Sequence, residues 1–326
     1  MKDKKINLGI IGTGRIAKRI TPFIKRKASV EVVCVYNPNI VSAKRFAEKF
    51  DIQYIAESLD EITDKIDAVY IASPNETHFE YTKFFLKNSI HVLCEKPMAF
   101  RKDDALELFC ISDQNEVVLM EAVKTAFLPG FRALVDFAVN GEIGEIVDMD
   151  AAFTRITDKS KREFTDKKYG GSFTEFGTYG LLAVDKIYSK KVTGVRFFSR
   201  MDCDINSNNI DTYTRAEFDI CNEAAFATIK TGIGFKTQGD LTIAGSSGYL
   251  YVPAPWWLTK KIQRHYEEPS KVELYEYPLE EEGFFYEIEE FISRINGNKE
   301  MYFTSEDSIF TASYMEKFLK ASGRLK

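Results

Sequence analysis

The fold is decided by a short stretch near the start of the chain, INLGIIGTGRIAKRI, which covers residues 6–20. Its first part is a nearly continuous apolar run, and its last part has the spacing of an amphipathic helix. Between them lies G-x-G-x-x-A, in which Gly12 permits a tight turn, Gly14 lets the backbone approach a pyrophosphate and Ala17 allows close helix packing. A glycine turn with a purely structural role is the alternative. We expect a strand, a turn and a helix whose N-terminus binds phosphate.

Apolar runs and helical patterns alternate in the same way up to about residue 120. The runs predict strands at residues 6–11, 30–36, 68–72, 90–94 and 117–120. Apolar residues at three- and four-residue spacing predict helices at residues 16–27, 41–50, 77–87 and 104–111. Continuous apolar strands are expected where helices cover both faces of a parallel sheet. We therefore expect an α/β dinucleotide-binding domain over residues 1–122.

The second part of the chain has a different pattern. Residues 212–220 alternate between apolar and polar side chains, which predicts a half-exposed, mainly antiparallel sheet. Helical patterns return at residues 284–295 and 305–319. Since 326 residues exceed the size at which one core usually stops growing, we expect a second domain over residues 123–326 for substrate binding and oligomerisation.

Composition and charge exclude several classes of protein. A net charge of -5 with interspersed signs gives no field that attracts nucleic acid or anionic lipid. No apolar segment approaches the ~20 residues of a membrane span. The five cysteines form no close pair, which favours a reduced, cytoplasmic location, and the three histidines are too scattered to predict a zinc site. We expect no nucleic acid, membrane or metal partner.

Two further segments leave predicted strands near the expected cofactor site. The second strand ends at Asn37, which has the chemistry to bind a ribose hydroxyl, but no Asp or Glu selects NAD and no adjacent Arg selects NADP. Residues 73–75 follow a strand and enter a helix, so their backbone is expected to line the nicotinamide side. His78 either contributes there or is simply packed in the helix.

Lys96 follows the apolar run 90–94 within the sequence Glu95-Lys96-Pro97. This position is the carboxyl edge of a parallel sheet, where ligands bind. A lysine there is able to orient a substrate hydroxyl and to act as general acid or base. The alternative is a surface lysine in a turn enforced by proline.

A glycine-rich loop at residues 170–171 leads into a helical pattern that carries Glu175 and Tyr179. Four residues apart, these side chains share one helix face. A carboxylate and a phenol on one face suit polyol binding and proton relay, although a surface pair without function is the commoner case. Arg162 lies in the basic stretch before the loop, where it either meets an anionic substrate or remains solvated.

With these signals in this order, the chain resembles the glucose-fructose oxidoreductase, inositol dehydrogenase and rhizopine-catabolism (Gfo/Idh/MocA) family along almost its whole length. The resemblance is carried by residues 12–17, Ser73-Pro74-Asn75 with His78, Glu95-Lys96-Pro97, Met120-Glu121-Ala122 and the loop around Gly177. It implies a Rossmann domain, a C-terminal α/β domain built on a large open sheet, and a tightly held NAD or NADP.

The resemblance also implies roles for individual residues. The family's catalytic and substrate-orienting lysine falls on Lys96. Many members have Asp and His where this chain has Glu175 and Tyr179; the tyrosine is similar to the dimeric dihydrodiol dehydrogenase and glucose-fructose oxidoreductase branch, and the role of Glu175 stays open. We expect Lys96 and Tyr179 to share proton transfer in one cleft. The expected cofactor contacts are Gly12, Thr13, Gly14, Arg15, Ile16, Asn37, Ser73, Pro74, Asn75, His78, Glu95 and Lys96. The expected substrate contacts are Lys96, Arg162, Glu175 and Tyr179.

Two kinds of function fit these expectations. The first is hydride transfer between NAD or NADP and a secondary hydroxyl or carbonyl of a sugar, cyclitol or dihydrodiol. The second is a non-catalytic redox or metabolite sensor, which would not need the pair Lys96 and Tyr179. A broad sheet face that helices do not cover predicts a homodimer or homotetramer.

Overall fold

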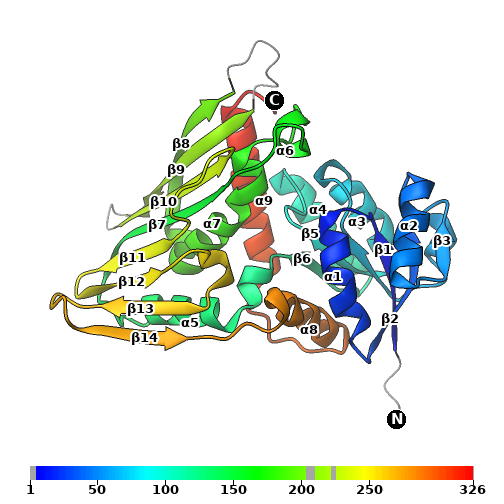
Figure 1. Cartoon of the computed structure of the whole chain (residues 1–326), viewed down its shortest axis with the longest axis horizontal. Helices are drawn as coiled ribbons and strands as arrows, with labels where there is room; N and C mark the ends of the chain where they lie inside the picture. The colour runs from blue at the N-terminus through cyan, green and yellow to red at the C-terminus, as the bar shows by residue number, and fades with distance from the viewer. Residues whose placement is uncertain (1–4, 203–209, 222–224, 326) are drawn as a thin grey trace. The chain divides into compact units, whose positions relative to one another are not determined.

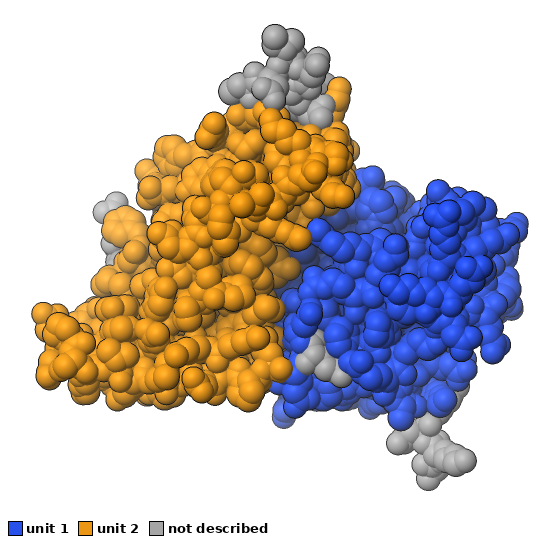
Figure 2. All heavy atoms as spheres, in the orientation of Figure 1, with its two compact units in different colours: residues 1–124, 280–312 blue, residues 125–279, 313–326 orange. Residues whose placement is uncertain are grey.

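The computed structural model describes residues 5–202, 210–221 and 225–325 (Figure 1). Their contacts divide the chain into two compact units (Figure 2). Unit 1 is formed by residues up to 124 together with 280–312, and unit 2 by residues 125–279 and 313–326. The sequence predicts a single boundary near residue 122. The segment 280–312, expected in the second domain, instead packs with the first, because its helix covers an apolar sheet face there.

Unit 1 is built on a six-stranded sheet in which all the pairs are parallel, with strand order β3-β2-β1-β4-β5-β6. The strands are β1 (Ile6–Ile11), β2 (Val30–Tyr36), β3 (Tyr54–Ala56), β4 (Ala68–Ile71), β5 (His91–Glu95) and β6 (Leu119–Ala122). The predicted parallel sheet is confirmed. Only the three-residue edge strand β3 was not predicted, since it is too short to show a periodic pattern.

The helices of unit 1 up to residue 122 follow the strands as the sequence predicts, and two later helices, expected in the second domain, join them. They are α1 (Arg15–Lys25), α2 (Ile40–Phe50), α3 (His78–Lys87), α4 (Lys102–Gln114), α8 (Phe284–Ile295) and the first part of α9 (Ser305–Ala321). Asn39 caps α2 by accepting the Ser42 N–H at 3.1 Å. Asp307 accepts from the Thr304 N–H at 2.6 Å just before α9, which fixes where that helix begins.

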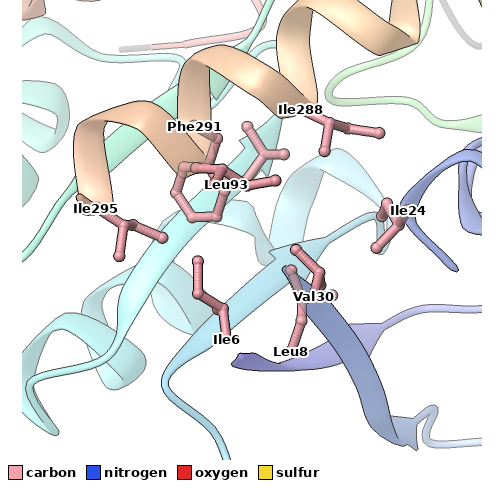
Figure 3. Close-up of a pocket in the computed structure, with 9 residues that line it drawn as sticks. Ile6, Leu8, Ile24, Val30, Leu93, Ile288, Phe291 and Ile295 are labelled. Atoms are coloured by element: carbon pink, nitrogen blue, oxygen red, sulfur yellow. The ribbon is translucent and has the colours of Figure 1, made fainter. Parts of the chain in front are cut away.

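Helix α8 completes the core of unit 1 on one sheet face. Figure 3 shows Ile288, Phe291 and Ile295 of this helix opposite Leu8 and Leu93, around a small pocket. The residues that line the pocket are all apolar: Ile6, Leu8, Ile24, Val30, Leu93, Ile288, Phe291, Ile292 and Ile295. A lining without a polar atom offers nothing to orient a substrate, so the pocket is a packing gap and not a candidate for chemistry.

Unit 2 is built on an eight-stranded sheet with strand order β14-β13-β12-β11-β7-β10-β9-β8. The strands are β7 (Ile146–Arg155), β8 (Val192–Met201), β9 (Asp211–Ile220), β10 (Phe226–Ile233), β11 (Leu241–Gly245), β12 (Gly248–Val252), β13 (Lys261–His265) and β14 (Val272–Glu276). Every pair is antiparallel except β7 with β10. The predicted large, mainly antiparallel sheet is confirmed.

One face of this sheet is covered by helices (Figure 1). The helices of unit 2 are α5 (Pro129–Val139), α6 (Arg162–Thr165), α7 (Ser172–Tyr188) and the rest of α9. A Cβ added at Gly180 of α7 would lie 2.5 Å from Ile229 Cγ2 on β10. Glycine at this position therefore lets α7 lie directly on the sheet.

Candidate active site

Three loops of unit 1 leave neighbouring strands at the same edge of the sheet. Residues 12–14 follow β1, residues 72–75 follow β4 and Lys96 follows β5, and these strands are adjacent in the order β1-β4-β5. The strand order reverses between β1 and β4, because β2 and β3 lie on one side of β1 and the later strands on the other. Open parallel sheets bind ligands at the carboxyl ends of the strands beside such a reversal.

The turn between β1 and α1 has the shape that a dinucleotide requires. Gly12 has φ +95°, and a Cβ there would lie 2.5 Å from the Ala72 carbonyl oxygen, so the fold needs glycine. At Gly14 an added Cβ would meet only that oxygen, at 3.9 Å, and Gly14 and Arg15 are exposed. The N-cap residue of α1 is Gly14, which has no side chain to bond the first N–H groups of the helix. The space and the donors fit a pyrophosphate.

A small polar cluster fixes the end of β2. The Asn37 amide donates to Thr13 Oγ1 at 2.9 Å, and Thr13 Oγ1 lies 2.8 Å from Ser42 Oγ. The Asn39 N–H donates to Asn37 Oδ1 at 2.8 Å. Asn37 and Thr13, both expected to contact the cofactor, are thus held in place by their neighbours, and the cluster contains neutral groups only.

The loop after β4 contains a donor that lacks a partner. Asn75 Nδ2 is buried and has no hydrogen bond within the described residues. Ser73 Oγ lies 2.7 Å from Thr77 Oγ1, which braces the loop. An orphaned amide donor at the carboxyl end of β4 fits a polar group of a bound ligand, since buried donors are rarely left unpaired.

His78 connects the loops that follow β4 and β5. Its side chain is 1% exposed, with Nδ1 2.9 Å from the Pro97 carbonyl oxygen and Nε2 3.0 Å from the Ser73 carbonyl oxygen. Both ring nitrogens therefore face backbone carbonyls. In this arrangement the histidine holds the two loops in register, as a packed histidine would.

Lys96 is half-buried in the turn after β5, and Glu95 beside it points into the unit. Glu95 accepts the Tyr70 hydroxyl at 2.7 Å and the Lys96 N–H at 3.3 Å. Burial raises the pKa of the Glu95 carboxyl, while the Tyr70 hydroxyl and the charge of Lys96 lower it. Glu95 was expected to contact the cofactor; in this structure both of its oxygens bind protein groups.

Two more buried carboxyl groups interact electrostatically with these residues: Glu287 with Glu95, and Glu121 with Lys96. Burial raises the pKa of Glu287 on α8 well above its usual value; the Glu95 carboxyl adds to the rise and Lys124 opposes it. Neither Glu287 oxygen has a hydrogen bond within the described residues. Burial raises the pKa of Glu121 on β6 to about 7, against the Met98 N–H and the charge of Lys96.

Sequence reasoning did not predict this acidic cluster, although Glu95 and Glu121 each belong to a quoted motif. Tyr70 lies in an apolar strand, and Glu287 lies on an amphipathic helix more than 200 positions later. One signal was available in the sequence: the acidic residue Glu287 stands at a position of α8 that is surrounded by apolar residues. Among the described residues, no three His, Cys, Asp or Glu side chains are arranged to hold a metal ion.

In unit 2, Glu175 and Tyr179 lie on the first turns of α7, as predicted. Of residues 171–180 they are the two that are not buried. The Tyr179 ring contacts Phe153 at 5.0 Å between centroids, and Phe153 stacks on Trp257 at 3.5 Å. The helix therefore presents a carboxylate and a phenol together beside an aromatic cluster.

Arg162 pairs with this helix face. Its guanidinium lies 3.3 Å from Glu175 Oε2 and 3.5 Å from Asp166 Oδ2. The neighbouring Lys161 and Lys167 are exposed. Arg162 and Glu175, which the sequence proposed separately, thus lie together.

A buried ion pair holds the N-terminus of α7. Asp211 is fully buried and accepts from Ser172 Oγ at 2.7 Å, from the Phe173 N–H at 2.9 Å and from Thr214 Oγ1 at 2.8 Å. Arg324, near the C-terminus, lies 3.1 Å from Asp211 Oδ1 and also donates to the Gly170 carbonyl. The chain end thereby fixes the helix that carries Glu175 and Tyr179.

The expected site residues are divided between the units. Lys96 and all the expected cofactor contacts belong to unit 1, whereas Arg162, Glu175 and Tyr179 belong to unit 2. The expectation that Lys96 and Tyr179 share one cleft stays a prediction. No helix within the described ranges is long and apolar enough to cross a membrane.

Comparisons with known proteins point to one family. The GFO_IDH_MocA model, described as an oxidoreductase family with an NAD-binding Rossmann fold, matches residues 6–123. The uncharacterized oxidoreductase YgjR of Escherichia coli (strain K12) is 37% identical over 40% of each chain. The scyllo-inositol 2-dehydrogenase (NADP(+)) IolU of Bacillus subtilis (strain 168) is 28% identical, over 98% of this chain and 97% of its own.

A solved structure shares the fold. It is KijD10, a 3-ketoreductase from Actinomadura kijaniata in complex with NADP and TDP-benzene. The two structures superpose with a TM-score of 0.82 at 24% identity, covering 96% of each chain.

Proposed function

We propose that this chain is a member of the Gfo/Idh/MocA family of NAD(P)-dependent oxidoreductases, and that it oxidises a secondary hydroxyl, or reduces the matching carbonyl, of a sugar, cyclitol or dihydrodiol. The observation that carries the proposal is the position of Lys96 at the carboxyl end of β5, at the same sheet edge as the turn of Gly12 and Gly14. The names of IolU and KijD10 support a polyol-type substrate.

We assign the cofactor to the open edge of unit 1. The bound nicotinamide supplies the hydride acceptor or donor. The first N–H groups of α1 bind the pyrophosphate, with Gly14 leaving the space for it, and the orphaned amide of Asn75 binds a polar group of the cofactor or substrate. The neutral cluster of Asn37, Thr13 and Ser42 carries no carboxylate that would repel a 2′-phosphate, so both NAD and NADP are accepted.

We assign proton transfer to Lys96 and Tyr179. When the hydroxyl carbon loses a hydride, the hydroxyl loses a proton, which a neutral amine or a phenolate accepts. A neighbouring ammonium favours the ionised phenol, so the two groups act together. Glu175 and Arg162 bind the remaining hydroxyls of the substrate.

The test is a screen of sugars, cyclitols and dihydrodiols with NAD and NADP read separately, followed by site variants on the best substrate. Lys96→Ala and Tyr179→Phe each lower turnover about 10²- to 10⁴-fold while cofactor affinity changes little. Tyr54→Phe, at a half-buried tyrosine bonded to Glu61, is the matched control and keeps its turnover. Full turnover of Tyr179→Phe removes the tyrosine from the mechanism, and cofactor binding without turnover on any substrate favours a sensor.

A second variant tests the cofactor site by itself. Gly14→Val fills the space reserved for the pyrophosphate, whereas the fold tolerates the substitution because an added Cβ meets only one atom. We expect the fluorescence change on NADH or NADPH binding to disappear with an unchanged circular dichroism spectrum. Unchanged cofactor affinity in a folded Gly14→Val protein contradicts the assignment.

We further propose that the protein forms a homodimer, or a dimer of dimers, through the sheet face opposite α7. Ile229 faces α7, so Phe226, three residues away, faces outward. Strand pairing places Phe226 in one row with Tyr249 and Val272, whose exposed fractions are 62%, 39% and 44%. Exposed apolar side chains aligned on one face favour a partner.

Light scattering at micromolar concentrations tests the dimer. Phe226→Asp is expected to lower the measured mass to that of one chain, because it places a charge in the buried interface. A wild-type protein that is already monomeric contradicts the proposal.

The four cysteines within the described residues are all free, which supports a reducing, cytoplasmic location. We propose this location as well, and cell fractionation tests it.

A further inference from the structure

Glu121 joins β6 to the turn that carries Lys96. In the pairing of β5 with β6 it lies opposite Cys94, two residues before the lysine. Its side chain is 2% exposed, and Oε1 accepts the Met98 N–H at 2.9 Å. The turn at residues 96–98 is thus attached to the neighbouring strand by this carboxyl group.

The second oxygen of Glu121 is less well bonded than the first. Oε2 has no hydrogen bond of ordinary geometry within the described residues, and neither has the hydroxyl of Ser308 on α9, which faces the carboxyl. An unpaired buried acceptor costs about 1–3 kcal/mol, and the cost is larger when the group is charged. The cost suggests that the carboxyl is retained for another reason.

The groups that face Glu121 supply the reason. Lys96 favours the ionised carboxyl, and Glu95 on β5 disfavours it. The charge of Glu121 also helps to raise the pKa of the Cys94 thiol on β5, which is raised mainly by burial. Ser308 of α9 contributes a hydroxyl that also favours the ionised form. Once it is ionised, the buried Glu121 carboxylate and the half-buried Lys96 ammonium therefore attract each other.

We propose that Glu121 is a positioning residue for Lys96: it holds the lysine's turn through Met98 and, when ionised, it stabilises the ammonium form of the lysine. The proposal rests on the function assigned to Lys96 above. It adds that the carboxyl behind the turn controls the fraction of this lysine that is ready to donate a proton.

A pH dependence follows from the same contacts. Because burial raises the pKa of Glu121 to about 7, the carboxyl changes charge in the neutral range. Below pH 7 it is neutral and Lys96 lacks this anion; above pH 7 it is charged and supports the ammonium. In the direction that reduces a carbonyl, where the lysine donates, Glu121 extends activity to higher pH.

Three variants separate the hydrogen bond that Glu121 makes to the Met98 N–H from the negative charge of its carboxyl group. Glu121→Gln keeps an oxygen for the Met98 N–H but carries no charge, Glu121→Asp keeps the charge, and Glu121→Ala removes both. With Gln, we expect the alkaline limb of carbonyl reduction to move about one pH unit lower. With Asp the limb stays near its wild-type position, and with Ala kcat also falls because the turn is released.

The decisive readout is independent of turnover. Trace acetylation of the full chain with acetic anhydride, quantified by mass spectrometry of the digest, reports the neutral amine fraction of each lysine. Lys87, exposed at the end of α3, is the internal standard. At pH 8 we expect the ratio of Lys96 to Lys87 labelling to rise about tenfold in Glu121→Gln and to stay near wild type in Glu121→Asp.

Wild-type protein provides the same test should a variant fail to fold. As Glu121 ionises, the neutral fraction of Lys96 is suppressed, so its labelling rate rises less steeply with pH around pH 7 than that of Lys87. The proposal is overturned if the labelling rate of Lys96 in wild type rises with pH as steeply as that of Lys87, or if the labelling ratio is unchanged in folded Glu121→Gln. If labelling behaves as expected but Lys96→Ala keeps full turnover, the pairing stands and the catalytic role of Lys96 fails.

Discussion

Each unit buries carboxyl groups, but the two units treat them differently. In unit 2 the buried Asp211 has an arginine, two hydroxyls and a backbone N–H as partners. In unit 1, Glu287 has no hydrogen-bond partner for either oxygen and Glu121 lacks one for Oε2, within the described residues. Burial raises the pKa of all three, yet only around Asp211 does a full set of partners oppose that rise.

The difference separates a structural site from a functional one. A satisfied buried ion pair fixes one arrangement, here the N-terminus of α7, and its members depend on each other. An unsatisfied buried acid lowers stability and persists where its charge serves a task, which is why such groups concentrate at active sites. In unit 1, Glu95 and Glu121 interact with the charge of Lys96, whereas Asp211 and Arg324 of unit 2 hold the helix that presents Tyr179.

Breaking the satisfied pair is expected to have the largest effect on stability. Arg324→Met leaves Asp211 buried without its cation, and loss of one partner of a buried pair typically costs about 3–5 kcal/mol. Urea unfolding followed by the fluorescence of Trp256 and Trp257, both in unit 2, measures the loss. A loss below about 1 kcal/mol would show that the pair is not structural.

Neutralising Glu287, a buried acid without a hydrogen-bond partner among the described residues, is expected to raise the free energy of unfolding instead of lowering it. Because burial raises the pKa of Glu287, the folded protein binds its proton more tightly than the unfolded chain, so stability falls as pH rises through the neutral range. Glu287→Gln removes this slope and raises the free energy of unfolding at pH 8 by about 1 kcal/mol or more. A Gln variant less stable than wild type at pH 8 would mean that the pairing with Lys124 outweighs burial.

A surface ion pair gives the smallest effect and serves as the reference. Lys83 Nζ lies 2.6 Å from Glu107 Oε1, closer than the atoms of the pair in unit 2, but both side chains are partly exposed. Lys83→Ala is expected to cost less than about 1 kcal/mol. The same urea titration measures it, and a cost equal to that of Arg324→Met would show that burial does not explain the difference between the units.

Local patterns were sufficient to predict much of the fold. Apolar runs predicted five strands of the parallel sheet, because strands buried on both faces have no polar alternation. Gly12, Gly14 and Lys96 were predicted at strand ends, and the structure places all three at one sheet edge. The helical spacing of Glu175 and Tyr179 was sufficient to put them on one face of α7.

Features that depend on distant segments were not predicted. The return of residues 280–312 to unit 1 depends on which apolar face α8 covers, and its own sequence does not specify that face. The contact of Tyr70 with Glu95, and of Asp211 with Arg324, joins residues whose separation carries no periodic signal. The sequence left Arg162 either as a cation for substrate or as a solvated side chain, and its two ion pairs with carboxylates of its own unit were not predicted.

The most direct test of the account is to measure stability and activity together in Glu121→Gln. The pKa of this carboxyl is raised from 4.5 to about 7, so wild-type stability falls as pH rises between those values, and the Gln variant is expected to be about 1–3 kcal/mol more stable than wild type at pH 8. At the same pH its carbonyl reduction is expected to be slower, because Lys96 has lost its anion. A variant that is less stable than wild type and keeps the wild-type pH profile would contradict the claim that unit 1 keeps its buried acids for chemistry.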